Sequence, residues 1–475
     1  MAKCYASLGE IRSEIKNGKI TVASLVSDYL QQINANKQLN AFVEVFEDEA
    51  IVRSKEIDQK FEQGTPGKLA GMVLAIKDNI CYRGHQVSAA SRILENFTSI
   101  YSSTVVERLL AEDAIIIGRC NCDEFAMGAT NETSFYGPVK NFADETRVSG
   151  GSSGGTAVAV QANLCHAAIG TDTGGSVRQP AAYCGLIGLK PTYGRISRYG
   201  IIAYASSFDQ VGTITRSVED AALLLEVMAG ADKYDSTLAQ KAVPAYAKDL
   251  KSDSGKKKIA YFGDALTSPG VDAEMKTALQ TAINRLKAGG HTVEPVKFEY
   301  LDYLVPSYYV LVTAEASSNL ARYDGVYYGY RSTEAPNLLS TYKRSRSEGF
   351  GKEAKRRIML GTFVLSAGYY DAYYAKAQKI RRLIKEKTGQ LLNEYDFILV
   401  PSAPGVAPLI GETDKDPVAN YMADIFTVQA SLAGIPAISL PAGNNSHGMP
   451  LGLQLLAKSF AEQELLNFSQ YFLQL

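Results

Sequence analysis

Residues 149–178 of the 475-residue chain read SGGSSGGTAVAVQANLCHAAIGTDTGGSVR. This stretch contains two loops of small residues, 150–155 and 171–176, separated by an apolar segment. Within that segment, residues 157–160 favour a helix and residues 164–169 favour a buried strand. A strand between the two loops would place them close together in space. Glycine in such loops permits positive φ and lets backbone N–H groups approach a ligand closely.

Three chemistries compete for these loops. A phosphate-binding loop would need a lysine after its glycines, in the pattern G-x-x-x-x-G-K-[ST], and none follows here. The nucleophile elbow of α/β-hydrolases, G-x-S-x-G, occurs at 150–154, with His447 as the late histidine that such a triad requires. The third chemistry is a serine activated by a lysine of depressed pKa. Lys77 follows the apolar run 73–76, although a lysine at a strand end is more often an exposed edge residue.

Outward from this segment, short apolar runs alternate with helical patterns. The clearest candidate strands are 73–76, 115–117 and 398–400. Alternation of this kind predicts an α/β protein with a large, mixed but mostly parallel central sheet and helices on both faces. A strand–helix–strand pattern follows the composition shift near Gly230. We therefore expect one domain over residues 1–475, with a candidate inserted subdomain around 230–345.

The overall composition argues against several functions. The chain carries 49 Lys and Arg against 50 Asp and Glu, whereas a protein that grips RNA by itself usually has a basic excess. Six scattered cysteines and four isolated histidines are typical of a reduced cytoplasmic enzyme. They give no metal-ligand spacing, even at Cys120 and Cys122, and no apolar run is long enough to span a membrane. We expect a cytoplasmic protein without a metal site and without a membrane partner.

Residues 303–374 are rich in tyrosine, and lysines and arginines follow closely within the same stretch. Aromatic side chains interleaved with basic ones can bind single-stranded nucleic acid. The alternative is a set of amphipathic helices whose tyrosines pack and whose charges are solvated. Because the net charge is only −1, we favour the helices.

Taken with Lys77, the glycine–serine stretch resembles the amidase signature family. The family patterns are G-G-S-S-G-G-S, here at 150–156 with threonine last, and G-x-D-x-G-G-S-[IV]-R, here at 170–178. The resemblance implies a triad in which Ser176 is the nucleophile, Ser152 relays protons and Lys77 is the base. It implies a cis peptide bond before Ser152 and no metal or other cofactor in this chain. It also implies an oxyanion hole built on the backbone of Thr173, Gly174 and Gly175.

Other segments resemble one branch of this family, the glutaminase subunits of three-subunit glutamyl-tRNA(Gln) amidotransferases. These segments are 123–128, 188–195, 205–210, 349–352 and 356–361. In that branch the chain hydrolyses glutamine and passes ammonia to a B subunit, which holds Glu-tRNA(Gln) and uses ATP and Mg²⁺; a C subunit completes the complex.

The same resemblance implies three residues that bind glutamine. They are Tyr308, Arg357 and Asp424, with Arg356 as the alternative to Arg357. A cation and an anion are needed because glutamine carries an α-carboxylate and an α-ammonium group. Two competing functions stay open at this point, a free-standing amidase of the same family acting on another carboxamide, and a non-catalytic scaffold.

Overall fold

The computed structural model describes residues 3–252, 255–412 and 421–475. Its described strands are β1 (Phe42–Val45), β2 (Val73–Lys77), β3 (Ile115–Cys120), β4 (Ala167–Asp172), β5 (Ile187–Lys190), β6 (Gln210–Thr215), β7 (Lys258–Phe262), β8 (Thr292–Val296), β9 (Phe397–Pro401), β10 (Ala437–Asn444) and β11 (Pro450–Leu456). They form one mixed sheet in the order β1-β3-β2-β4-β6-β5-β10-β11-β9-β7-β8. All three predicted strands are present, as β2, β3 and β9.

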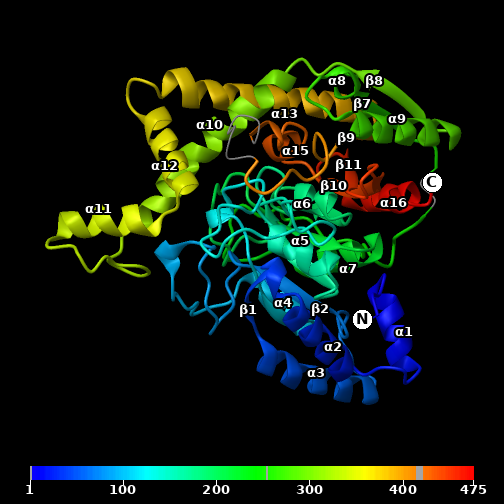
Figure 1. The fold of residues 1–475 in the computed structure, drawn as a ribbon. Helices are drawn as coiled ribbons and strands as arrows, with labels where there is room; N and C mark the ends of the chain where they lie inside the picture. The colour runs from blue at the N-terminus through cyan, green and yellow to red at the C-terminus, as the bar shows by residue number, and fades with distance from the viewer. Residues whose placement is uncertain (1–2, 253–254, 413–420) are drawn as a thin grey trace.

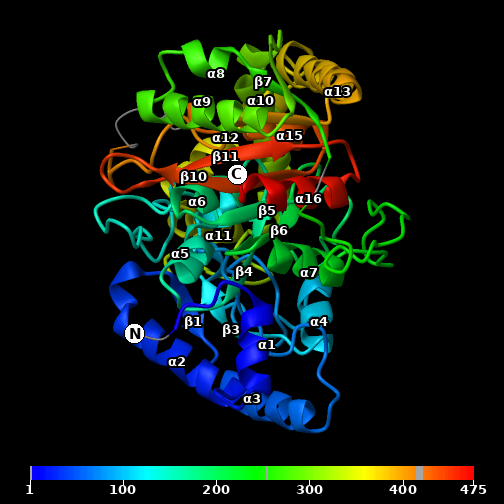
Figure 2. The ribbon, with the colours of Figure 1, turned by 90° about the vertical axis from the view of Figure 1, so that its right-hand side faces the viewer.

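Helices lie on both faces of this sheet (Figure 2). Those described are α1 (Leu8–Lys16), α2 (Val22–Ala35), α3 (Glu47–Glu62), α4 (Thr104–Ala111), α5 (Gly154–Gln161), α6 (Arg178–Tyr183), α7 (Val218–Met228), α8 (Asp264–Thr267), α9 (Ala273–Ala288), α10 (Leu301–Asn319), α11 (Leu338–Gly349), α12 (Lys352–Leu365), α13 (Lys376–Glu394), α15 (Val428–Ala433) and α16 (Glu462–Phe472). Short 3₁₀ turns span Lys37–Leu39, Arg92–Leu94, Glu124–Ala126 and Leu320–Arg322, and a π turn spans Asp371–Ala375. None of these described helices is both long and apolar enough to cross a membrane.

The mixed α/β architecture is confirmed, but the expectation of a mostly parallel sheet is wrong. Among the described strands, the parallel neighbours are β2–β3, β2–β4, β7–β8 and β7–β9, and the other six pairs are antiparallel. Parallel pairs occur where a helix crosses between strands, as α4 does between β2 and β3. The loop between β10 and β11 is too short for a crossover, so these strands pair as a hairpin.

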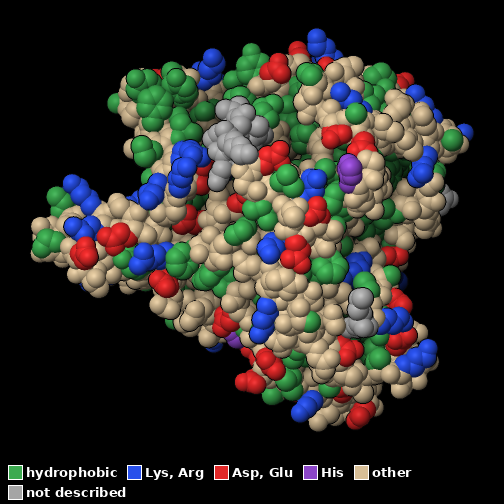
Figure 3. Space-filling view, viewed as in Figure 1, with side chains coloured by type: hydrophobic (Ala, Val, Ile, Leu, Met, Phe, Trp, Pro, Cys, Tyr) green, Lys and Arg blue, Asp and Glu red, His purple; other side chains and the backbone are tan. Residues whose placement is uncertain are grey.

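The strand–helix–strand pattern of the 230–345 region forms β7, α9 and β8. β7 pairs with β9 and with β8, so these strands extend the same sheet at its far edge. The tyrosine-rich stretch forms α10, α11 and α12, and α11 projects from the body of the molecule (Figure 1). Basic and acidic side chains are interspersed along this projection (Figure 3), and ion pairs such as Arg344–Glu334 link them.

The centre of the sheet brings the predicted loops together. β2 and β4 are parallel neighbours in a register that pairs Ile76 with Ile169, and both strands are fully buried. Lys77 at the end of β2 therefore lies at the same edge as Thr171 near the end of β4. The buried helix α5 follows Ser153 and packs on both strands, so the first serine loop opens at this edge too. The expectation that one strand carries both serine loops to one place is confirmed.

Candidate active site

Lys77 is the last residue of β2, and its side chain is completely buried. Its Nζ lies 2.7 Å from Ser152 Oγ, 3.0 Å from Ser153 Oγ and 3.1 Å from Thr171 Oγ1. Burial lowers the pKa of Lys77 to about 8, against the opposing influence of nearby thiol and carboxyl groups. A lysine with this pKa is partly neutral near physiological pH, so its nitrogen can accept a proton.

The groups around Lys77 fix the direction of its lone pair. The Ser153 hydroxyl donates to the Thr171 carbonyl oxygen at 3.1 Å, which turns the lone pairs of Ser153 Oγ toward Lys77. Asn79 Nδ2 donates to Thr171 Oγ1 at 3.0 Å. A neutral amine has two N–H groups and one lone pair, and Ser153 and Thr171 accept the two N–H groups. The lone pair is then directed at the Ser152 hydroxyl, the nearest of the oxygens.

The two serine loops are in contact through their backbones. The Gly151–Ser152 peptide bond is cis, as the resemblance predicted. The Ser153 N–H donates to the Ser176 carbonyl oxygen at 3.1 Å, which holds one loop against the other. Among the described residues no hydrogen bond joins the hydroxyls of Ser152 and Ser176. Lys77 and Ser152 therefore contact each other directly, whereas Ser176 is held near them by the loop.

The turn between β4 and α6 carries Thr173, Gly174 and Gly175, followed by Ser176. In the part of the chain that the structure describes, the N–H groups of Gly174, Gly175 and Ser176 donate to no acceptor. Backbone N–H groups that are free and fixed in this way can stabilise a developing oxyanion. A Cβ at Gly174 would lie 2.4 Å from Tyr308 Oη, and one at Gly175 would lie 2.4 Å from Thr427 Oγ1. Only glycine fits at these two positions.

Asp172 and Arg178 brace this turn from behind. Arg178 Nη2 lies 2.9 Å from Asp172 Oδ1, and both side chains are completely buried. Arg178 Nη1 also donates to the Thr427 carbonyl oxygen at 2.8 Å. The ion pair therefore ties the turn to the segment that leads into α15.

Tyr308, Arg357 and Asp424 lie around the same turn. Tyr308 reaches Gly174 from α10. Arg357, on α12, donates from Nη1 to Tyr204 Oη at 2.8 Å, and Asp424 Oδ2 accepts from Tyr309 Oη at 2.9 Å. The guanidinium group of Arg357 also lies 5.3 Å from the centroid of the Tyr309 ring. One tyrosine therefore contacts both of the charged side chains.

Arg357 and Arg356 differ in burial. The Arg357 side chain is 5% exposed and forms an ion pair with Glu353 at 2.8 Å, whereas the Arg356 side chain is 42% exposed. On geometry, Arg357 is thus the arginine that belongs to the buried cluster. Burial raises the pKa of Asp424 to about 7, so this carboxyl group is only partly ionised at neutral pH. An ammonium group beside it would favour the ionised form.

The residues of the alternative sites, the His447 triad and a metal site, are not brought together. His447 is exposed in the loop between β10 and β11, and its ring makes no hydrogen bond to a serine within the described residues. Lys77, rather than a histidine, is the basic side chain in contact with Ser152. Cys120 and Cys122 are buried free thiols. Over the described ranges, no group of three or more His, Cys, Asp or Glu side chains is placed to hold a metal ion.

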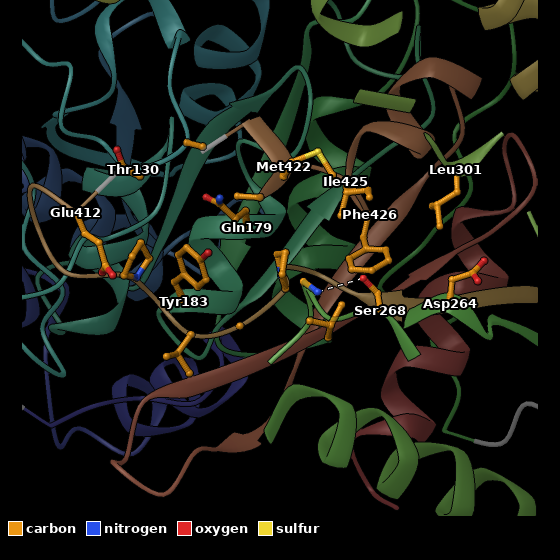
Figure 4. A pocket seen from close by; sticks show the side chains of 18 residues that line it. Thr130, Gln179, Tyr183, Asp264, Ser268, Leu301, Glu412, Met422, Ile425 and Phe426 are labelled. Atoms are coloured by element: carbon orange, nitrogen blue, oxygen red, sulfur yellow. Dashed lines mark hydrogen bonds between the residues drawn. The ribbon is translucent and has the colours of Figure 1, made fainter. Parts of the chain in front are cut away.

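A cavity of about 500 Å³ lies behind the serine loop (Figure 4). Most of its lining is apolar, and Thr130, Gln179 and Tyr183 contribute polar groups. Gln179 Oε1 accepts from the Gly151 N–H at 3.0 Å, so a lining side chain of the cavity contacts the loop. The triad residues are not among the described residues that line it, so we place the reaction at Lys77 and the loops rather than in this cavity.

Sequence reasoning missed several residues that complete the site. They are Ser153, Thr171, Tyr204, Asp209 and Tyr309. Ser153 and Thr171 lie inside the quoted loops, and Asp209 lies inside a segment that carried the resemblance. Their positions in these segments, and the adjacency of Tyr309 to Tyr308, were usable signals, but their contacts join residues far apart in the chain, such as Thr173 with Asp209.

Comparison with known proteins identifies the family. The Amidase family model matches residues 24–466. The chain is 48% identical to the A subunit of the glutamyl-tRNA(Gln) amidotransferase of Chlorobium limicola over 98% of both chains. It is also 48% identical to the corresponding protein of Chlorobaculum tepidum, over 97% of this chain and 96% of that one.

Solved structures agree with these matches. The A subunit of the glutamyl-tRNA(Gln) amidotransferase of Thermotoga maritima superposes with a TM-score of 0.79 at 38% identity, over 95% of this chain and 94% of that one. The peptide amidase of Stenotrophomonas maltophilia superposes with a TM-score of 0.82 at 29% identity, over 98% and 95%. With its paired serine loops, its buried lysine and these relatives, the chain belongs to the amidase family.

Proposed function

We propose that this chain is the glutaminase subunit of a glutamyl-tRNA(Gln) amidotransferase and hydrolyses glutamine with the triad Lys77–Ser152–Ser176. The observation that carries the proposal is the buried Lys77 amine, whose pKa of about 8 and 2.7 Å contact with Ser152 suit a general base. The relatives from such amidotransferases, at 48% identity over nearly the whole chain, favour this role over that of other amidases.

In the first half-reaction, neutral Lys77 takes the proton of Ser152 while Ser152 takes that of Ser176. Ser176 Oγ attacks the side-chain carbonyl carbon of glutamine, and the carbonyl oxygen becomes an oxyanion. The backbone N–H groups of Thr173, Gly174 and Gly175, together with that of Ser176, stabilise this charge. The proton then returns through Ser152 to the amide nitrogen, the C–N bond breaks, and ammonia leaves.

In the second half-reaction, water attacks the γ-glutamyl ester on Ser176. The same relay removes a proton from the water and returns one to Ser176 Oγ as the ester breaks. Glutamate leaves and the free triad is restored. Attack by ammonia would simply reverse the first step, so net hydrolysis requires that ammonia depart before water arrives.

The charged ends of glutamine give the pocket its selectivity. Arg357 binds the α-carboxylate, and Asp424 binds the α-ammonium group. Tyr308 closes the pocket against the turn. Support comes from the shared contacts of Tyr309 with both charged side chains and from the burial of Arg357 and Asp424. A simple carboxamide would leave both charges without their intended partner.

The ammonia serves the conversion of Glu-tRNA(Gln) to Gln-tRNA(Gln) in translation. A B subunit holds the tRNA and uses ATP and Mg²⁺ to activate the glutamyl carboxylate, and a C subunit completes a cytoplasmic heterotrimer. The balanced charge of this chain, with 49 basic and 50 acidic residues, supports a division of labour in which another subunit binds the tRNA.

The test is a glutaminase assay of the full chain with and without its co-expressed B and C subunits, followed by an assay for Gln-tRNA. Release of glutamate and ammonia from glutamine, coupled to Gln-tRNA formation in the complex, is the expected result. The competing function is a free-standing amidase, to which the similarity with the peptide amidase points. Equal activity on glutamine and on neutral amides, with no complex formed, would favour that alternative.

A further inference from the structure

Residues 204–209 form a tight turn directly before β6, which we call the bridge segment. The N–H groups of Phe208 and Asp209 both donate to the Ala205 carbonyl oxygen at 2.9 Å. Tyr204, Phe208 and Asp209 are 2%, 2% and 4% exposed. The segment is thus a closed turn with these three side chains buried and Ser206 and Ser207 half-buried.

One end of the bridge segment holds the oxyanion turn. Asp209 Oδ1 accepts from Thr173 Oγ1 at 2.7 Å. The same carboxylate accepts from the N–H groups of Tyr204 at 2.9 Å and Ala205 at 3.0 Å. Burial raises the pKa of Asp209 to about 6, so it is still mostly ionised at neutral pH, and hydrogen bonds to a charged acceptor are the stronger kind.

The other end contacts the side chains that face the substrate. Tyr204 Oη accepts from Arg357 Nη1 at 2.8 Å, and the guanidinium group lies 5.5 Å from the centroid of the Tyr204 ring. Phe208 packs edge-on against Tyr308, with ring centroids 5.9 Å apart, and Tyr308 in turn lies against Gly174. The bridge segment therefore contacts the turn at Thr173 and also contacts Tyr308 and Arg357.

We propose that Asp209 is a positioning residue, which sets the oxyanion turn at a fixed distance from the side chains that read the charged ends of the substrate. It acts through Thr173 on one side and through the backbone of Tyr204 on the other, and it does not touch the substrate. This inference rests on the function proposed above. When Arg357 binds glutamine, the oxyanion turn would then already be positioned beside the side-chain amide.

The contact matters for the rate because the oxyanion turn must be placed accurately. The turn has little freedom of its own, because Tyr308 and Thr427 leave no space at Gly174 and Gly175. Thr173 is the first residue after β4, at the start of the turn, so its hydroxyl contact fixes where the free N–H groups point. A displacement of about 1 Å in a reacting group can lower a rate by about 100-fold.

The experiment measures kcat and KM for glutamine and for butyramide, a neutral primary amide, with the full chain and its partner subunits. The variants are Asp209→Asn, Thr173→Val, the double variant and Thr173→Ser. Rates are taken per active site, counted by labelling of the nucleophilic serine with a fluorophosphonate. Asp209→Asn and Thr173→Val should each lower kcat on both substrates on the order of 100-fold, while Thr173→Ser, which keeps the hydroxyl, retains activity.

The double variant separates positioning from general damage. Because both changes break the same contact, it should be no more than about twofold worse than the poorer single variant. Asp144→Asn is the control, since Asp144 also accepts from a threonine hydroxyl and a backbone N–H, both of Thr146, and its other contact is Arg147 rather than the bridge segment. Its kcat should stay within about twofold of the parent.

Two outcomes would overturn the inference: full activity of Thr173→Val, or multiplicative losses in the double variant. If Asp209→Asn fails to fold by circular dichroism, the comparison of Thr173→Val with Thr173→Ser decides alone. Failure of the proposed function looks different, because Ser176→Ala would then stay active, or the parent chain would act equally on glutamine and butyramide and form no complex. With Ser176→Ala inactive and Thr173→Val unimpaired, only the role of Asp209 is lost.

Discussion

The rate of amide hydrolysis should depend on the ionisation of Lys77. Burial lowers its pKa from 10.5 to about 8, a change that disfavours the charged form by roughly 3 kcal/mol. Only the neutral amine can take the Ser152 proton, and its fraction rises with pH. It is about 1% at pH 6, about 10% at pH 7 and about half at pH 8. With an unshifted pKa, the neutral fraction at pH 8 would be roughly 150-fold smaller.

We therefore expect kcat/KM to rise about 50-fold between pH 6 and pH 8 and to level off above pH 9. The assay is ammonia release from butyramide at low substrate concentration between pH 5.5 and 9.5, because kcat/KM reports the ionisation of the free enzyme. Butyramide has no charged end, so Asp424 does not enter its profile. With glutamine the profile should be steeper below pH 7, since Asp424 must lose its proton, with a pKa of about 7, to bind an ammonium group.

Two variants test whether Lys77 or His447 is the base. Lys77→Ala should abolish activity over the whole range, whereas His447→Ala should leave both the rate and the profile nearly unchanged. A butyramide profile that is flat between pH 6 and pH 8 would exclude a buried lysine base. An inactive His447→Ala with an active Lys77→Ala would place the protein in a different hydrolase class.

Three further predictions follow from the proposed function. Ser176→Ala should abolish glutamine hydrolysis and covalent acylation, and an acyl group trapped on another serine by mass spectrometry would contradict the assignment. Arg357→Ala should raise KM for glutamine by about 10- to 100-fold, the scale of a lost charged contact, and leave KM for butyramide unchanged; equal changes would mean that Arg357 does not read the carboxylate. The purified chain should form no Gln-tRNA from glutamine, ATP and Glu-tRNA(Gln), whereas the three-subunit complex should form it; product from the chain alone, measured by acid gel, would refute the division of labour.

The sequence predicts the elements of this fold better than their pairing. Local patterns locate β2, β3, β7, β9 and the helices between them, because apolar runs and helical periodicity are local properties. The direction of pairing is not local. β5 and β6 lie between β4 and β10 in the sheet and are antiparallel to every neighbour, although nothing in their short sequences distinguishes them from parallel strands.

The site, like the fold, can be predicted where a local pattern specifies it and not where distant residues meet. The serines and Lys77 come from a motif with fixed spacing, and the structure brings Lys77 to Ser152 over 75 residues of chain. The resemblance prefers Arg357 and keeps Arg356 as the alternative, since adjacent residues on a helix differ only in the face that they occupy. The helix α12 directs Arg357 inward to Tyr204 and leaves Arg356 at the surface. Asp209 was missed because its role lies in a contact with Thr173, 36 residues earlier.

Burial has opposite effects on the two ionisable groups that matter most, and this asymmetry explains how the site can prefer glutamine. It lowers the pKa of Lys77 to about 8 and raises that of Asp424 to about 7, so both groups are partly neutral in the empty enzyme. In the proposed mechanism, Lys77 must be neutral to take the Ser152 proton. Asp424 must become charged, and only a substrate with an ammonium group stabilises that charge. A neutral amide can thus use the base but gains nothing at Asp424, whereas glutamine supplies the charge that the buried carboxyl group lacks. In the proposed function, the same low dielectric that activates the base therefore adds to the selectivity that Arg357 gives the pocket.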